Sequence, residues 1–177
     1  KPVTALARDT LGNHWIGTWS DGVYRLDSRG QLKHFTATNT PGSINSNIIW
    51  DILPGADGDV LFATQEGGLN RFDPATETFS AQIPQKGGAG ISSLDLYCVV
   101  RDRHQRLWVG GTNGLDRYDP ASKTYVHFGR HDAGMRTMPS LMVRNIFEES
   151  RGRVWIGTLD AGVFIWVSDD KPLIALG

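Results

Sequence analysis

The sequence predicts an all-β protein built from four copies of one unit, and two sets of recurring residues predict it. The first set is a ten-residue line that returns at intervals of 46, 47 and 47 residues and starts at Asp9, Gly55, Asp102 and Glu149. Three of the four copies contain a tryptophan followed by Ile-Gly or Val-Gly. A period of this length marks one supersecondary unit repeated along the chain.

The second set of residues fixes the register of the repeat. Each copy continues into Gly-Val or Gly-Leu, and the first three copies close on Arg25-Leu26-Asp27, Arg71-Phe72-Asp73 and Arg117-Tyr118-Asp119. One unit therefore contains four short apolar runs, which in the first copy are about residues 3 to 8, 14 to 19, 22 to 27 and 32 to 36. None is long enough for a typical helix, and none has a sustained 3.6-residue period, so each is predicted to be a β-strand.

Four antiparallel strands per unit match one blade of a β-propeller, in which neighbouring blades cover both faces of each sheet. The predicted blades are about residues 1–46, 47–93, 94–140 and 141–177. An aromatic residue at the start of the second strand is expected to be buried between blades. These residues are Trp15, Trp108 and Trp155, and the second copy has Leu61-Phe62 there instead.

Composition limits the possible function classes. Hydrophobic residues make up 40% of the chain and charged residues 21%, which are ordinary values for a globular domain. The net charge of −1 provides no field to attract phosphate backbones, which argues against a nucleic-acid partner. No apolar run approaches the length that spans a bilayer, so no membrane contact is predicted for this segment. Cys98 stands alone, which excludes an internal disulfide.

The residue types that usually carry catalysis or metal binding have simpler explanations here. Asp9, Asp102 and Glu149 recur once per blade, so they are interpreted as acceptors for turn amides rather than as acid/base or metal groups. His127 and His131 lie four residues apart at the end of a strand, and nothing completes a metal-binding set. No Gly-x-Ser-x-Gly elbow or phosphate loop occurs. The sequence predicts no catalytic residue, metal or cofactor, although a Ser, His and Asp could still meet in space.

The repeat resembles the two-component regulator propeller repeat, Asn-x-Val-x-x-Ile-x-x-Asp-x-x-Gly-x-Leu-Trp-Ile-Gly-Thr followed by Gly-Leu-x-Arg-Phe-Asp. The resemblance covers essentially the whole chain in four copies, and it is closest over Asp9 to Thr18 with Gly22 to Asp27. In the second copy, Asn47 to Ile52 matches the opening of the family repeat and Gly68 to Pro74 matches its close. The departures are Gly55 for Asp, Leu61-Phe62-Ala63 for Trp-Ile-Gly, Gln105 for Gly and Ile165-Trp166-Val167 for Arg-Phe-Asp.

The resemblance implies a non-enzymatic sensor: the periplasmic, ligand-reading part of a membrane-anchored bacterial regulator whose output domain is a histidine kinase or a diguanylate cyclase. Several such propellers respond to oligosaccharides. Rings in that family have about seven blades, so four blades look like a fragment that is completed by further blades of the parent chain or by self-association. The alternatives are a propeller enzyme, such as a lyase or glycosidase, and a protein-interaction scaffold.

A ligand site is predicted on the face of the propeller that carries the long connections, about residues 37–46, 81–93 and 129–140, together with the turns between second and third strands. One position of the inner strand also varies among Thr4, Trp50, Tyr97 and Arg144. A sugar needs aromatic faces to stack on and charged groups to hydrogen-bond. The alternative is that Trp50 and Tyr97 only fill space between blades. The predicted ligand-binding residues are Trp19, Asp21, Trp50, Glu66, Tyr97, Arg144 and Asp160.

Overall fold

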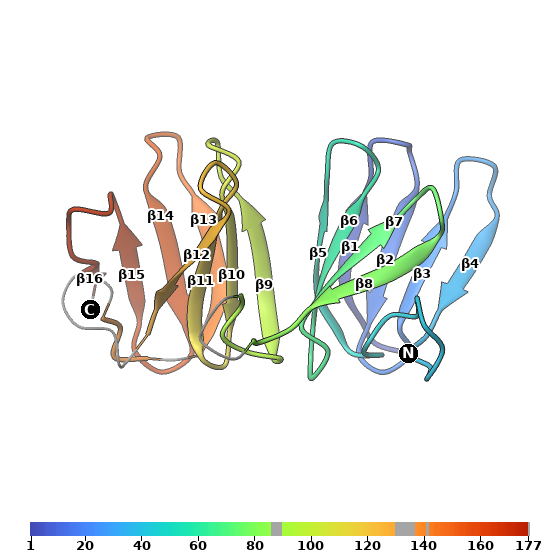
Figure 1. The fold of residues 1–177 in the computed structure, drawn as a ribbon, viewed down its shortest axis with the longest axis horizontal. Coiled ribbons are helices and arrows are strands. Elements are labelled where there is room, and N and C mark those ends of the chain that lie inside the picture. Colours follow the sequence, from blue (N-terminus) through green and yellow to red (C-terminus); the bar gives the residue numbers. More distant parts are fainter. Residues whose placement is uncertain (86–89, 130–136, 141, 177) are drawn as a thin grey trace. The chain divides into compact units, whose positions relative to one another are not determined.

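The all-β architecture is confirmed. The computed structural model describes residues 1–85, 90–129, 137–140 and 142–176, and over these residues the chain forms four four-stranded antiparallel sheets with no helix (Figure 1). In every sheet the strands lie in the order in which they follow along the chain. The first strand of each sheet is therefore the inner strand of a blade and the fourth strand is the outer one.

The strands lie where the repeat predicts them. The first sheet consists of β1 (Val3–Arg8), β2 (His14–Thr18), β3 (Val23–Leu26) and β4 (Leu32–Phe35). The second sheet consists of β5 (Ile49–Pro54), β6 (Val60–Thr64), β7 (Leu69–Asp73) and β8 (Thr78–Gln82). The third sheet consists of β9 (Leu96–Arg101), β10 (Leu107–Gly111), β11 (Gly114–Asp119) and β12 (Thr124–Phe128). The fourth sheet consists of β13 (Val143–Glu148), β14 (Val154–Thr158), β15 (Val163–Trp166) and β16 (Ile174–Leu176).

The four sheets form two compact units, which we call the first and second blade pairs. The first blade pair comprises Lys1–Ile83 and Leu94–Leu96, and it holds the first and second sheets. The second blade pair comprises Pro84–Ser93 and Tyr97–Gly177, and it holds the third and fourth sheets. Each pair has its own buried hydrophobic cluster.

The core of the first blade pair is a group of aromatic rings at the junction of its two sheets. Trp15 of β2 is fully buried, and its ring meets Phe62 at 5.4 Å and Phe72 at 4.9 Å in edge-on arrangements. Close approach of the sheets also needs Gly17, because a Cβ there would lie 2.8 Å from Cγ2 of Ile49. The predicted burial of the second-strand aromatic between blades therefore holds at this junction.

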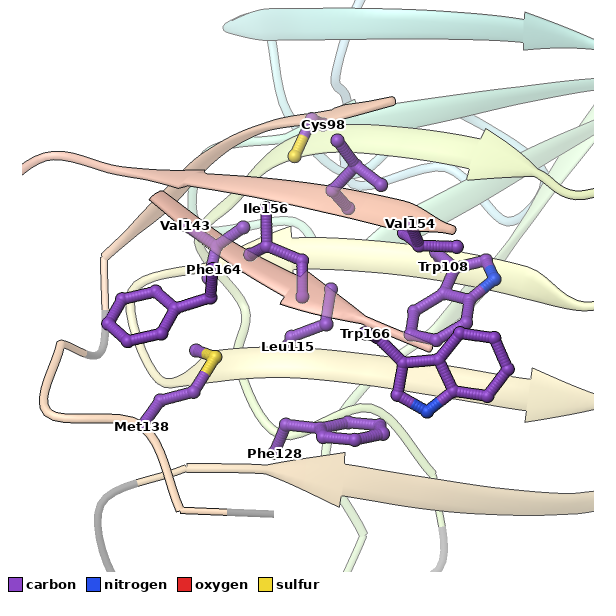
Figure 2. Close-up of a cluster of buried hydrophobic side chains, with 11 residues drawn as sticks. Cys98, Trp108, Leu115, Phe128, Met138, Val143, Val154, Ile156, Phe164 and Trp166 are labelled. Carbon is purple, nitrogen blue, oxygen red and sulfur yellow. The ribbon is translucent and has the colours of Figure 1, made fainter. Parts of the chain in front are cut away.

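The second blade pair repeats this arrangement. Trp108 of β10 is fully buried and packs edge-on against Trp166 at 5.2 Å, with Phe128 at 5.9 Å (Figure 2). Gly110 again lets the sheets approach, because a Cβ there would lie 2.6 Å from both Cγ1 of Val143 and Sγ of Cys98.

The expectation that Trp155 is buried between blades is wrong for this chain. Trp155 is only half-buried, and its cross-strand neighbour Phe147 is 64% exposed. Both residues lie on the same side of the fourth sheet, and no other sheet of the second blade pair packs against that side. Within the first blade pair, Leu6 of the first sheet is 72% exposed, whereas Ile52 at the equivalent position of the second sheet is 7% exposed.

Candidate functional site

In each blade pair, the turns between second and third strands lie beside chain that enters an inner strand. The amide of Gly22 donates to the carbonyl of Asn47, just before β5, at 2.9 Å. In the second blade pair, the amide of Leu159 donates to the carbonyl of Met142, just before β13, at 3.0 Å. We call this edge of each pair the loop face. The predicted association of turns and connections on one face is therefore present in both pairs.

A recurring threonine fixes the turns that carry four of the predicted residues. The hydroxyl of Thr18 donates to the carbonyl of Gly22 at 2.9 Å, Thr64 donates to Gly68 at 2.7 Å and Thr158 donates to Gly162 at 2.8 Å. In the first and fourth sheets the same oxygen also accepts an amide of its turn, that of Asp21 or Ala161. The turns are thus held at both ends, which limits the motion of the side chains they present.

The variable position of the inner strand coincides with a break in the strand ladder. The register shifts between Val3 and Ala5 in the first sheet, between Ile49 and Asp51 in the second and between Val143 and Asn145 in the fourth. The residues at the shift are Thr4, Trp50 and Arg144. A bulge re-aims a side chain and often lies beside a functional site. Sequence reasoning found the variable position but not the bulge that sets its geometry.

Two of the predicted residues meet in the first blade pair. The rings of Trp19, from the turn after β2, and Trp50, from β5, pack edge-on with their centroids 4.7 Å apart and their planes at 84°. Trp19 remains 46% exposed, whereas Trp50 is half-buried. The backbone of Trp19 is held by its amide, which donates to the carbonyl of Pro2 at 3.0 Å. The exposed indole of Trp19, from the first sheet, is thus held by its contact with Trp50, from the second sheet.

Asp21 and Glu66, the two predicted acidic residues of the first blade pair, differ in their contacts. Asp21 binds Nζ of Lys1 at 2.5 Å and accepts the hydroxyl of Tyr24 at 2.5 Å, and these two contacts, Lys1 first, hold the pKa of its carboxyl below the ordinary value. The carboxylate of Asp21 is therefore ionised and already engaged. Glu66 is exposed in a left-handed backbone conformation with φ of 59°, and its amide donates to Oδ1 of Asp95 at 2.8 Å.

The remaining three predicted residues lie in the second blade pair. The guanidinium carbon of Arg144 lies over the ring of Tyr97, 4.2 Å from its centroid, which is within the range of a cation–π contact. The two residues occupy equivalent positions in neighbouring sheets. Asp160 is exposed in the turn after β14 and accepts a hydrogen bond from the buried hydroxyl of Ser140. The seven residues thus form two groups, one on each blade pair, and their role in ligand binding stays a prediction.

The recurring acids have a structural role that is more specific than the one predicted. One oxygen of Asp9 accepts the amides of Leu11 and Asn13, and the other accepts the indole N–H of the buried Trp15 at 2.8 Å. The carboxylate therefore fixes both the turn and the tryptophan at the blade junction.

The other copies repeat the indole bond wherever both partners are present. Asp102 accepts Nε1 of Trp108 at 2.8 Å, and Glu149 accepts Nε1 of Trp155 at 3.1 Å. The second copy has Gly55 and Leu61 instead, so it lacks the acid and the indole together. This joint loss was a signal in the sequence that the two positions are bonded, and sequence reasoning missed it.

One Ser, His and Asp do meet in the second blade pair. The buried carboxylate of Asp116 accepts the amide of Ser92 at 2.7 Å and its hydroxyl at 3.0 Å, while Nδ1 of His127 lies 2.5 Å from the other oxygen. In a catalytic triad the serine bonds to the histidine, which in turn bonds to the acid. Here the serine bonds to the acid, so the group ties the chain that enters the third sheet to β11.

His131 lies outside the described residues. Within those residues, no group of three or more His, Cys, Asp or Glu side chains is arranged to hold a metal ion. Nor does any helix that is long and apolar enough to cross a membrane occur in the described part of the chain.

Comparison with known proteins supports the repeat. Residues 137–160 match the family model of the two component regulator propeller. Histidine kinase P4 of Formosa agariphila is 24% identical over 161 residues, which are 87% of this chain and 11% of that protein. The chain therefore spans only a small part of this relative. The resemblance to the two-component regulator propeller repeat is confirmed.

Solved structures establish the fold. The extracellular domain of a hybrid two component system from B. thetaiotaomicron superposes with a TM-score of 0.86 at 20% identity, covering 99% of this chain and 24% of that one. Virginiamycin B lyase from Staphylococcus aureus superposes with a TM-score of 0.68 at 10% identity, covering 98% of this chain and 55% of the lyase. At these identities the likeness establishes the propeller fold and nothing about ligand or reaction.

Proposed function

From the two-component regulator propeller repeat that this chain carries, we propose that it is a non-enzymatic, ligand-sensing module of a membrane-anchored signal-transduction protein. The module lies on the periplasmic or extracellular side, and the parent protein carries a histidine kinase or a diguanylate cyclase as its output. The names of its relatives support this assignment, since one is a histidine kinase and another is the extracellular domain of a hybrid two component system.

The proposed ligand is a small carbohydrate that binds on the loop face. The observation that carries this proposal is the Trp19–Trp50 pair, in which a 46% exposed indole is braced by a second one. Sugars present faces of C–H groups that stack on aromatic rings, and their hydroxyls bond to charged groups. Stacked aromatic contacts contribute about 0.5–1.5 kcal/mol each beyond area burial, so two or three of them with several hydrogen bonds support roughly micromolar binding.

The predicted residues differ in their contacts, so we assign them different roles. Glu66 is exposed and offers a carboxylate to ligand hydroxyls, whereas Asp21 is engaged by Lys1 and Tyr24 and orients its turn. In the second blade pair, Arg144 lies over the ring of Tyr97, so this contact holds its guanidinium before a ligand arrives. Asp160 supplies a second acidic group on that pair.

Titration calorimetry of the chain against a panel of oligosaccharides tests the proposal. We expect one sugar class to bind with a dissociation constant of about 1–100 μM, and Trp19→Ala and Trp50→Ala each to weaken binding at least about fivefold because stacking is lost. Phe147→Ala is the matched control, since this aromatic residue is exposed but lies at mid-strand in β13.

Two outcomes contradict the proposal. A ligand whose affinity is unchanged in both tryptophan variants rules out this site. Chromatography of the binding mixture after prolonged incubation tests the non-enzymatic assignment, and conversion of the bound sugar to a product would show that the module is an enzyme.

A further inference from the structure

The aromatic pair of the proposed ligand site is held from the start of the first sheet's inner strand. The amide of Trp19 donates to the carbonyl of Pro2 at 3.0 Å, which fixes the backbone of one member of the pair. The hydroxyl of Thr4 donates to the carbonyl of Ile49, in the second sheet. Ile49 directly precedes Trp50, the other member of the pair. One tryptophan is therefore held directly and the other through its neighbour in the chain.

The bond of Thr4 reaches the second sheet at its bulge. The register of β5 shifts between Ile49 and Asp51, so Trp50 stands outside the regular ladder. A bulge disrupts the ladder locally, and a buried carbonyl beside it needs a hydrogen-bond partner. Ile49 is fully buried, and Thr4 supplies a partner to its carbonyl from the neighbouring sheet. The hydroxyl thus fixes the backbone at the point that sets the direction of the Trp50 side chain.

Threonine is suited to this task, and at this repeat position it occurs in the first copy alone. Its β-branched side chain restricts χ1, so the hydroxyl keeps its direction. The equivalent residues of the other copies are Trp50, Tyr97 and Arg144, none of which has a hydroxyl on Cβ. The amide bond that holds Trp19 recurs in the second and fourth sheets and belongs to the common frame of the blades. The hydroxyl bond of Thr4 belongs instead to the aromatic pair.

We propose that Thr4 is a positioning residue of the ligand site: its hydroxyl fixes the bulge that presents Trp50, and Trp50 in turn holds the exposed ring of Trp19. This role rests on the ligand site proposed above. The two rings meet edge-on at 84°, so a change in the direction of Trp50 also changes the orientation of Trp19. Stacking depends on the orientation of the aromatic face. A bond outside the site therefore sets the affinity within it.

Circular dichroism of the full 177-residue chain tests this role without a ligand. Two indoles in contact couple their electronic transitions, and the band of this pair is the part of the spectrum that is lost in both Trp19→Ala and Trp50→Ala. Thr4→Val keeps the shape of the side chain and removes its hydroxyl, so it is expected to remove most of the pair band.

Calorimetry with the tightest-binding oligosaccharide of the panel adds a second readout. Thr4→Val should weaken binding by about threefold to tenfold, which corresponds to the loss of one hydrogen bond. Thr4→Ser restores the donor, so it should keep the pair band and stay within about twofold of the wild-type affinity.

Thr10→Val is the matched control. The hydroxyl of Thr10 donates to the carbonyl of Ala56 at 3.1 Å, so it also joins the first sheet to the second, but from the turn between the first and second strands. In an antiparallel sheet this turn and the turn that carries Trp19 lie at opposite ends. Thr10→Val should therefore leave the pair band and the affinity unchanged, although it removes a bond of the same kind between the same two sheets.

Several outcomes would overturn the role of Thr4: an unchanged pair band or an unchanged affinity in Thr4→Val, or a loss of the band in Thr4→Ser or Thr10→Val that equals the loss in Thr4→Val. If Thr4→Val does not fold, Thr4→Ala makes the same test, because it removes the hydroxyl at a half-buried position without adding bulk. Failure of the ligand proposal would look different. The pair band would respond as expected, which supports the positioning by Thr4, but no oligosaccharide of the panel would bind the wild-type chain.

Discussion

At the scale of single residues, a recurring carboxylate holds the tryptophan that is buried at the junction within each blade pair. Asp102 is almost completely buried, and it satisfies two turn amides, the guanidinium of Arg106 and the indole of Trp108. Removal of such an acceptor leaves buried donors without a partner, which costs more than the bond itself contributes. The recurring acid therefore fixes the position of the tryptophan as well as the turn.

A double-mutant cycle measures this bond. Asp102→Ala is expected to lower the free energy of unfolding by about 1–3 kcal/mol, because the indole of Trp108 loses its acceptor. Trp108→Leu, the residue type found in the second copy, is expected to be costly alone. The double variant should cost about 1 kcal/mol less than the sum of the two single changes, as measured by urea unfolding. Additive costs would mean that the bond contributes nothing.

The same carboxylates predict how stability depends on pH. Burial raises the pKa of Asp102, but the hydrogen bonds from Trp108 and Arg106 outweigh it, so the pKa lies below its ordinary value; Asp9 behaves in the same way. A pKa that is lower in the folded state contributes stability above the unfolded value of about 3.9, and this stability is lost as pH falls through the folded value.

Denaturation from pH 7 down to about pH 3 checks the expected sign. The free energy of unfolding should decline below about pH 4, and the decline should be shallower in Asp102→Asn, which cannot release a proton. An equally steep decline in that variant would mean that other acids govern the acid transition.

At the scale of elements, the close approach of sheets depends on glycine in the second strand. Gly110→Ala would force a Cβ to within 2.6 Å of Val143, so we expect a loss of about 1–3 kcal/mol in unfolding free energy from overpacking. Gly157→Ala is the matched control, because its nearest neighbour, Cβ of Asn145, lies 3.6 Å away. Thermal or urea unfolding compares the two variants. Equal losses would attribute the effect to strand backbone rather than to the junction.

The strands were predictable from the sequence, whereas the contacts between sheets were only partly so. The spacing of residues within the motif from Asp9 to Thr18 predicts where a strand starts, and the recurrence of that motif in four copies predicts the strands of every sheet. The ion pair between Arg25 and Glu77 was missed because Glu77 lies in the following copy, outside the recurring motif. The engagement of Asp21 was missed for a similar reason, since its partner Lys1 is not part of the repeat.

At the scale of the whole molecule, the unfolding free energy that is lost when a second-strand tryptophan is replaced should depend on whether a neighbouring sheet covers that residue. Trp108 is buried between two sheets, so Trp108→Ala is expected to cost about 3–5 kcal/mol. Trp155 occupies the same position in the last sheet but is half-buried, so Trp155→Ala should cost clearly less. Urea unfolding of both variants measures the difference. An equal cost would indicate that Trp155 is buried in solution.

The predicted ligand-binding residues that meet in the structure come from different sheets. Trp19 and Trp50 come from different sheets of the first blade pair, and Tyr97 and Arg144 come from different sheets of the second. The sequence predicted that the turns and the connections lie together on one face, because they must lie at the ends of a blade. It could not predict which side chains meet, because that depends on the inner-strand bulges and on packing between copies.

Those bulges have an evolutionary consequence. A residue that stands outside the strand ladder can be replaced without breaking backbone hydrogen bonds, and this chain already carries threonine, tryptophan and arginine at such positions. Each of these three blades thus has one exchangeable residue in a constant frame. Under the proposed sensing function, duplication and recombination of blades would change the residue presented to a ligand in single steps while the frame keeps folding.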